Sequence, residues 1–226
     1  MESLSPLTQL GTLALAIVVA LFGYVFVLPW LEHLLWRVKA VVRMVRHPRP
    51  LSSWVRAALA PLDRGGLWLD EHPLSARYVL RTSWSITCAK HWAREMSILI
   101  EGDRPMGAWD GLRAIRITLQ ASCAGWIPER DAWEISAVIA EELQRSHESF
   151  GELAHAYEQA FLAWATPQMD PRAIAGESRR RNRSIAWLES LGWCGVRFHR
   201  NVVARDARVR DRPSLRSLVE LLGQRY

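Results

Sequence analysis

The distribution of apolar residues divides the chain into one continuous apolar run and a longer stretch of helical periodicity. Residues 10–28 (LGTLALAIVVALFGYVFVL) contain no charged residue, and twelve of these positions are Leu, Ile, Val or Phe. At 1.5 Å per residue the run forms a helix about 29 Å long, which matches the hydrocarbon core of a bilayer. We therefore expect a retained transmembrane helix, with insertion favoured by on the order of 5 kcal/mol.

Two alternatives to a membrane anchor fit this run less well. A cleaved signal peptide needs a basic start and a small-residue cleavage site. Here the chain begins with MESLSPLTQL, and the run ends in Leu28-Pro29-Trp30-Leu31. A buried helix of a soluble domain is usually shorter than this run.

Basic residues follow the run and do not precede it, and this asymmetry predicts the orientation. By the positive-inside rule, the C-terminal side faces the cytoplasm and the short N-terminus lies outside. We expect the helix to continue through residues 36–46 and to contact anionic headgroups there. The residues predicted to contact the membrane surface are Arg37, Lys39, Arg43 and Arg46.

From Leu51 onward the apolar spacing is helical, which predicts an all-α cytoplasmic domain of several helices. Residues 193–210 alternate weakly, so a short hairpin near the C-terminus is an alternative there. We expect a transmembrane anchor with a basic juxtamembrane helix (1–50), a helical domain (51–172) and a basic C-terminal helical extension (173–226). Predicted helices cover 51–62, 74–84, 87–100, 109–124, 128–146, 153–164, 173–191 and 214–222.

The helix that starts near residue 109 is apolar on most of its surface, so we expect it to be central and buried. Asp110 is its predicted N-cap, and Gly125 ends it. Further along, Ser149 and Glu152 have the spacing of a capping box, which predicts a helix start.

Charge and composition narrow the class of protein. Residues 65–171 carry nine basic and fifteen acidic residues, whereas residues 172–226 carry thirteen basic and five acidic ones. All the basic residues except Lys39 and Lys90 are Arg, a usage typical of GC-rich bacteria, so we expect a bacterial inner-membrane protein. The 3 Cys include no C-x-x-C pair, which argues against a disulfide scaffold and a zinc ribbon.

Four motifs along the helical domain resemble a known family. They are Leu80–Ile86 (LRTSWSI), Trp109–Arg113 (WDGLR), Ala124–Trp133 (AGWIPERDAW) and Ser149–Glu152 (SFGE) followed by Tyr157. In order and spacing, over roughly residues 74–165, they are similar to the bacterial domain-of-unknown-function family 1266. Ser85 stands where that family's Trp-Gly-Ile motif has Gly. The resemblance implies an all-helical domain and supplies no activity.

Asp110 and Arg113 are the candidate polar site. They lie three residues apart on one predicted helix, where they form either a local ion pair or the anion-binding part of a cleft. No P-loop, nucleophile elbow or zinc-protease motif occurs. The spacing of His, Cys and carboxylates predicts no metal site, and no cofactor is implied.

An arginine run in the C-terminal extension is the second candidate surface. Its residues are Arg179, Arg180, Arg181 and Arg183. The run is either a solvated helix face, a surface for anionic lipid or a nucleic-acid contact. Because a tethered domain lies close to the bilayer, we favour anionic lipid headgroups and expect no nucleic acid.

These features predict a membrane-tethered helical module that binds a protein partner, in a class that includes toxin-neutralising and secretion-associated proteins. The alternative is a membrane-surface enzyme, hydrolase-like, with a cleft around Arg113. An open pocket with convergent polar groups at Arg113 would favour the enzyme. Packing of Arg113 against Asp110 and the core would favour the binding module.

Overall fold

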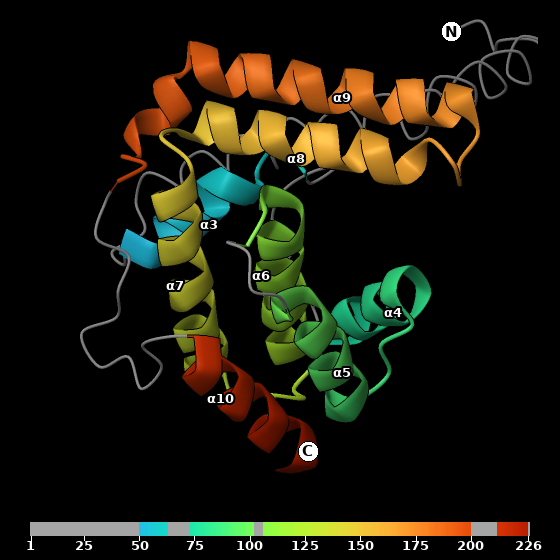
Figure 1. Ribbon diagram of the computed structural model, residues 1–226, viewed down its shortest axis with the longest axis vertical. Helices are drawn as coiled ribbons and strands as arrows, with labels where there is room; N and C mark the ends of the chain where they lie inside the picture. Colours follow the sequence, from blue (N-terminus) through green and yellow to red (C-terminus); the bar gives the residue numbers. More distant parts are fainter. Residues whose placement is uncertain (1–49, 63–72, 102–105, 200–211, 226) are drawn as a thin grey trace, which may run out of the picture. The chain divides into compact units, whose positions relative to one another are not determined.

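The part of the chain that the structure describes is built from helices (Figure 1). The structure is a computed structural model that describes residues 50–62, 73–101, 106–199 and 212–225. The helices are α3 (Pro50–Leu59), α4 (Pro73–Trp84), α5 (Ala89–Ile100), α6 (Ala108–Cys123), α7 (Glu129–Ser146), α8 (Phe150–Ala165), α9 (Pro171–Ser190), η3 (Gly192–Gly195, a 3₁₀ helix) and α10 (Arg212–Arg225). Over these ranges there is no strand, which confirms the all-α prediction.

Two sequence predictions extend beyond the described ranges. The predicted membrane span at 10–28 and nearly all of the juxtamembrane segment lie outside them. Of the helices that are described, none is both long enough and apolar enough to span a bilayer. The predicted hairpin is wrong in its described part, because residues 193–195 belong to η3 and residues 196–199 form no strand.

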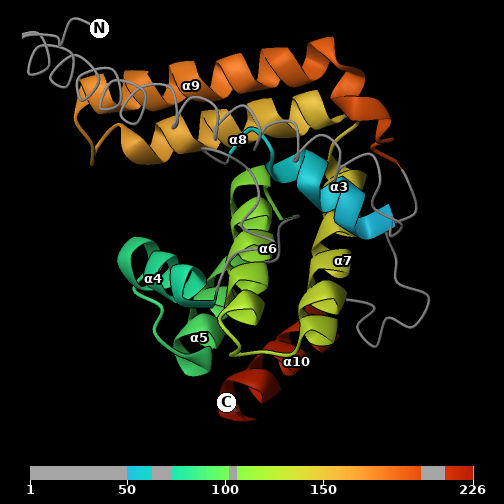
Figure 2. The same cartoon turned by 180° about the vertical axis from the view of Figure 1, so that it is seen from behind.

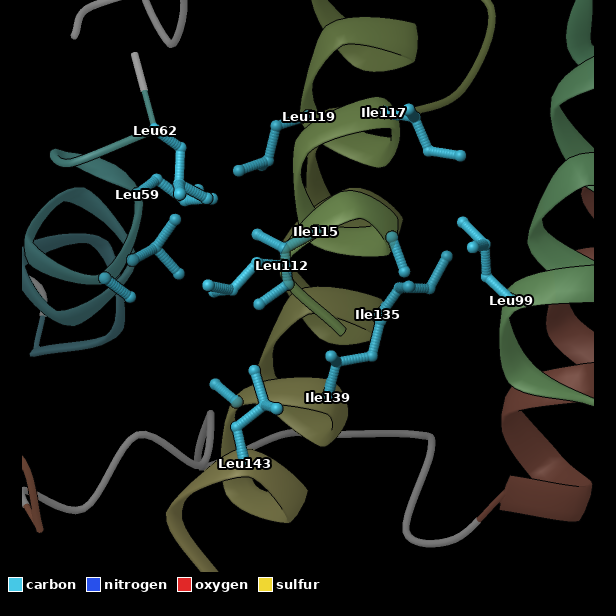
Figure 3. Close-up of a cluster of buried hydrophobic side chains, with 14 of the residues drawn as sticks. Leu59, Leu62, Leu99, Leu112, Ile115, Ile117, Leu119, Ile135, Ile139 and Leu143 are labelled. Carbon is cyan, nitrogen blue, oxygen red and sulfur yellow. The ribbon is translucent and has the colours of Figure 1, made fainter. Parts of the chain in front are cut away.

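Helix α6 forms the centre of the fold. It packs against α3, α4, α5, α7 and α8, and ten of its sixteen residues are buried. Figure 3 shows its apolar side chains meeting those of α3, α5 and α7. The cluster includes Leu59, Leu99, Leu112, Ile115, Ile117, Leu119, Ile135, Ile139 and Leu143. The expectation that this helix is central and mostly buried is confirmed.

Glycine allows α6 and α7 to approach closely. A Cβ atom built on Gly111 would lie 2.9 Å from a methyl carbon of Leu143. Any larger residue at position 111 would therefore force the Leu143 side chain to shift. The close approach of α6 and α7 at this point therefore depends on glycine.

Helix ends follow the predicted capping chemistry at two places and differ at a third. Gly125, with φ of 78°, ends α6 in a Schellman motif, where its N–H bonds to the Ser122 carbonyl. The Ser149 hydroxyl accepts the N–H of Glu152, as a capping box requires. Asp110, however, is not the N-cap of α6. That position is Gly107, and Asp110 lies in the first turn.

The end of α4 adopts a conformation that favours glycine. Ser85 follows the helix with φ of 55°, in the left-handed region. Its N–H bonds to the Arg81 carbonyl, and the N–H of Ile86 turns back to the Leu80 carbonyl. Ser85 thus closes an αL cap at the position where the resembling family has Gly.

Helices α8 and α9 run side by side over one end of the α6–α7 pair, as the reverse view shows (Figure 2). The predicted boundary at 172/173 falls in the first turn of α9, whose N-cap is Asp170. Helix α10 packs mainly on α5. Both C-terminal helices are therefore attached to the domain through their own apolar faces.

The αL cap generates a stability prediction. Ser85→Gly should raise the free energy of unfolding by about 0.5–1 kcal/mol. Glycine has no steric cost in the left-handed region, and the greater conformational entropy of glycine in the unfolded chain cancels only part of that gain. Ser83→Gly, in the last turn of the same helix, is the matched control and should destabilise. Thermal unfolding of the full-length chain followed by circular dichroism measures both. A lower melting temperature for Ser85→Gly would contradict the αL assignment.

Candidate functional site

The guanidinium of Arg113 lies over two indole rings, and these three residues form what we call the tryptophan–arginine cluster. The Cζ atom of Arg113 is 4.7 Å from the ring centroid of Trp84 and 5.0 Å from that of Trp109. Both distances are within the range of cation–π attraction. Trp109 and Arg113 are one turn apart on α6, and Trp84 is the last residue of α4.

Two local features place Trp84 at this cluster. The αL cap at Ser85 ends α4 directly after Trp84 and turns the chain away. At the other side of α4, Arg77 donates its Nε–H to the carbonyl of Ala124, at 2.9 Å. A cation at the C-terminal end of α6 also complements the helix dipole. Helix α4 is thereby fixed along α6.

Arg113 has an acidic neighbour, but it is a different residue from the one expected. Its Nη2 is 3.9 Å from Oε1 of Glu95 on α5, and the two side chains are 22% and 26% exposed. The structure records no ion pair between Arg113 and Asp110. The ion pair that the structure shows for Arg113 is thus a tertiary contact between α5 and α6. At 3.9 Å this contact is longer than a hydrogen bond.

Asp110 is affected by its position in the first turn of α6. Partial burial raises the pKa of the Asp110 carboxyl above its ordinary value, and the nearby charge of Arg113 only partly offsets this effect. Burial raises a carboxyl pKa because it disfavours the charged form.

An aromatic layer from α8 packs against the cluster. The ring of Trp109 has its centroid 4.9 Å from Tyr157 and 5.6 Å from Trp164. Burial raises the pKa of the Tyr157 hydroxyl, against the opposing charges of Arg116, Arg181 and Arg113. Trp164 is 43% exposed, so this layer continues from the core to the surface.

Arg181 is not a surface residue, which corrects one of the predicted lipid contacts. Its side chain is buried, pairs with Glu158 of α8 and lies over the ring of Phe161 at 3.7 Å. Ser178 donates a hydrogen bond to the same carboxylate. Arg181 faces inward because it lies on the side of α9 that carries Ile185.

The remaining arginines of the run differ in their surroundings. Arg179 and Arg183 are exposed, whereas Arg180 is half-buried and pairs with Glu177 at 3.0 Å. The predicted juxtamembrane contacts Arg37, Lys39, Arg43 and Arg46 lie outside the described residues.

One hydrogen-bond donor of the cluster, the buried Nε1–H of Trp84, lacks an acceptor within the described part of the chain. Among the described carboxylates, Glu95 lies 3.9 Å from Arg113, beyond hydrogen-bond distance, and Asp110 lies near enough to interact with its charge. Arg113, which is 22% exposed and has no hydrogen-bonded carboxylate among the described residues, suits a ligand that brings acceptor oxygens. In the described ranges, His, Cys and carboxylates form no group of three that could hold a metal ion.

Sequence reasoning identified Arg113 and missed part of its environment. Trp84 and Tyr157 are in the motifs that carry the family resemblance, so the convergence of those motifs could have suggested them. Glu95 gave no usable signal, because its pairing with Arg113 depends on how α5 packs on α6.

The comparisons with known proteins agree with the resemblance. Residues 90–190 match the family described as "Protein of unknown function (DUF1266)". No curated protein and no solved structure matches the chain. The matched segment runs from α5 to the end of α9 and includes Arg113, Trp109 and Tyr157.

The raised pKa of Asp110 makes stability depend on pH. A carboxyl whose pKa is higher in the folded state stabilises the fold fully below the unfolded pKa, and this contribution is lost as pH rises through the folded pKa. Asp110→Asn should therefore be more favourable at pH 7 than at pH 3, relative to the native chain. Melting temperatures across this range measure the difference. If the difference in melting temperature between Asp110→Asn and the native chain did not change with pH, the raised pKa of Asp110 would be contradicted.

The buried pair of Arg181 and Glu158 gives a second prediction. Arg181→Met should lower the free energy of unfolding by about 3–5 kcal/mol, because it leaves a buried carboxylate without its partner. The double variant Arg181→Met/Glu158→Met should recover most of that loss. Arg183→Ala, on the exposed face, is the control and should change stability by less than about 0.5 kcal/mol. Denaturant titration compares the four proteins, and equal losses for Arg181→Met and Arg183→Ala would refute the assignment.

Proposed function

We propose that this chain is a membrane-tethered protein-interaction module in which the tryptophan–arginine cluster binds a carboxylate of a protein partner. The observation that carries the proposal is the donor-rich cluster itself. The guanidinium of Arg113 is held over Trp84 and Trp109, and the described residues offer it no hydrogen-bonded carboxylate.

The physical reason is the shape of arginine. Aromatic rings contact the flat face of a guanidinium, while its N–H groups lie along its edge. An arginine packed on two indoles loses little further freedom when a carboxylate binds that edge in a bidentate manner. Trp and Arg are also the residues that most often dominate binding energy at protein interfaces. Partly exposed Trp164, 5.6 Å from Trp109, extends the apolar part of this surface.

Glu95 has a defined part in this proposal. Its carboxylate is near enough to attract Arg113 but does not form a hydrogen bond with it. A partner carboxylate would compete with Glu95 for the same guanidinium. Removing the charge of Glu95 should therefore strengthen partner binding.

The tether is the second part of the proposal and rests on residues 10–28. Their apolar character supports a single-pass anchor in a bacterial inner membrane, with the helical domain in the cytoplasm. Alkaline extraction of isolated membranes tests it. An integral protein stays in the pellet, and release into the supernatant would overturn this part. Toxin neutralisation and secretion are processes in which a tethered adaptor of this kind would serve.

A membrane-surface hydrolase remains the second candidate, supported by the raised pKa of Asp110 beside Arg113. A carboxyl with that property can act as a general acid or base. The interaction module has more support, because Arg113 is already held over two indole rings, an arrangement that suits the binding of a carboxylate.

Photo-crosslinking in living cells tests the interaction module. The full-length protein carries benzoylphenylalanine in place of exposed Arg81, which precedes Trp84 by almost one helical turn. Irradiation should give a discrete adduct with a second protein, and Arg113→Ala should remove it because the partner's carboxylate loses its cation. Glu95→Gln should increase the adduct.

Arg145→Ala is the matched control, since Arg145 is exposed on α7 and donates only to a backbone carbonyl. It should leave the adduct unchanged. Circular dichroism checks that the Arg113→Ala variant is folded. An adduct that persists in folded Arg113→Ala would overturn the proposal.

A further inference from the structure

Helix α9 is the outermost helix of the described fold, and only one of its faces is covered. It packs on α8 and on η3, and both views place it on the far side of α8 from the core (Figures 1 and 2). Its buried residues are Arg181, Ile185 and Leu188, which recur at helical spacing. The opposite face is exposed along the length of the helix.

That opposite face carries a line of arginines that ends in a tryptophan. Arg172, Arg179, Arg183 and Trp187 follow one another at intervals of seven, four and four residues, so they share one side of the helix. We call these four residues the outer face of α9. All four are exposed, and Trp187 is 43% exposed. The other exposed residues on this side are Ala175, Gly176, Ala186 and Ser190, so no carboxylate interrupts it.

The charges of this face are not neutralised by the described residues. The Nε–H groups of Arg179 and Arg183 bond to backbone carbonyls one turn earlier, at 3.2 and 3.3 Å. Their neighbours Arg180 and Arg181 instead pair with Glu177 and Glu158. The helix therefore separates its arginines into paired ones beside α8 and uncompensated ones on the outside.

We infer that the outer face of α9 binds the anionic headgroups of a lipid bilayer and orients the domain on the membrane. Charge complementarity supports this occupant, since exposed arginines attract anionic lipid additively. Trp187 supports it independently, because an exposed indole favours the headgroup region of a bilayer. Leu191, which is 43% exposed, continues the apolar end of the face. The inference deepens the proposed membrane tether and does not depend on the partner of Arg113.

Nucleic acid is the other polyanion that could meet such a face. A lipid surface is favoured because the exposed apolar groups lie at one end of the arginine line and are not interleaved with it as stacking aromatics would be. A bilayer can bind the arginines and the apolar end of the face at the same time. The arginines contact the lipid phosphates, and Trp187 lies among the headgroups.

A fluorescent probe on the face tests the inference in the full-length chain. Cys88, Cys123 and Cys194 are replaced by Ser, and Ala186→Cys carries the environment-sensitive dye NBD. The protein is placed in vesicles of phosphatidylcholine alone or with 30% phosphatidylserine. Emission should shift to the blue and strengthen with phosphatidylserine, and a probe at exposed Lys90→Cys on α5 should not respond.

Charge variants and salt separate the outcomes. Arg172, Arg179 and Arg183 all changed to Glu should abolish the shift, since three arginines contribute on the order of a hundredfold to partitioning. The same three residues changed to Lys should preserve it, and high salt should weaken it. Equal emission in the two vesicle types would overturn the inference. A larger response to duplex DNA than to phosphatidylserine would assign the face to nucleic acid instead.

The design also separates this inference from the tether. If alkaline extraction releases the chain from membranes, the tether fails, and the same labelled protein is then mixed with preformed vesicles. A blue shift under those conditions would still support the outer face of α9. A stable tether with no probe response would retain the anchor and reject the face.

Discussion

The burial of α6 is the constraint on which the remainder of the described fold depends. Five helices pack around it, and Gly111 allows α7 to approach at the distance that Leu143 requires. A helix surrounded in this way has few positions at which a polar side chain can reach the surface. Arg113 occupies one of them, between α4 and α5. The location of the candidate site therefore follows from the packing of the core, because Arg113 is one of only three charged residues of α6, with Asp110 and Arg116, and all three stay partly exposed.

The surroundings of Arg113 show how the chain motifs act together. The end of α4 supplies Trp84, the start of α6 supplies Trp109, and α8 supplies Tyr157 beneath it. Each of these residues belongs to a separate motif of the family resemblance, and the fold brings them to one place. Trp84, Trp109 and Tyr157 come from three different helices, and they meet because α4 and α8 both pack on α6. This convergence supports a common role for the motifs, which a purely local capping function would not require.

Local chemistry accounts for what the sequence could predict. Helix positions, the Gly125 end and the Ser149 cap follow from periodicity and backbone hydrogen bonding within a few residues. The i,i+3 spacing offered Asp110 as a partner of Arg113 and left an anion-binding role open, but it could not show that packing brings Glu95 of α5 near the guanidinium. The hairpin was suggested by alternation at Val196 and Phe198, which is too short a pattern to establish a strand.

The arginine run shows how one sequence feature can contain several physical roles. Composition treats Arg179, Arg180, Arg181 and Arg183 alike, but a helix turns by about 100° at each residue and gives each a different environment. Arg181 meets Glu158 in the interior, and Arg183, two residues later, lies on the opposite side of α9. Arg181 holds α9 to the domain, and Arg183 therefore keeps a fixed position on the surface. A rigid line of exposed charge needs such an internal attachment, because a loosely held helix would present its arginines in no constant direction. The buried ion pair and the exposed face are thus two parts of one arrangement.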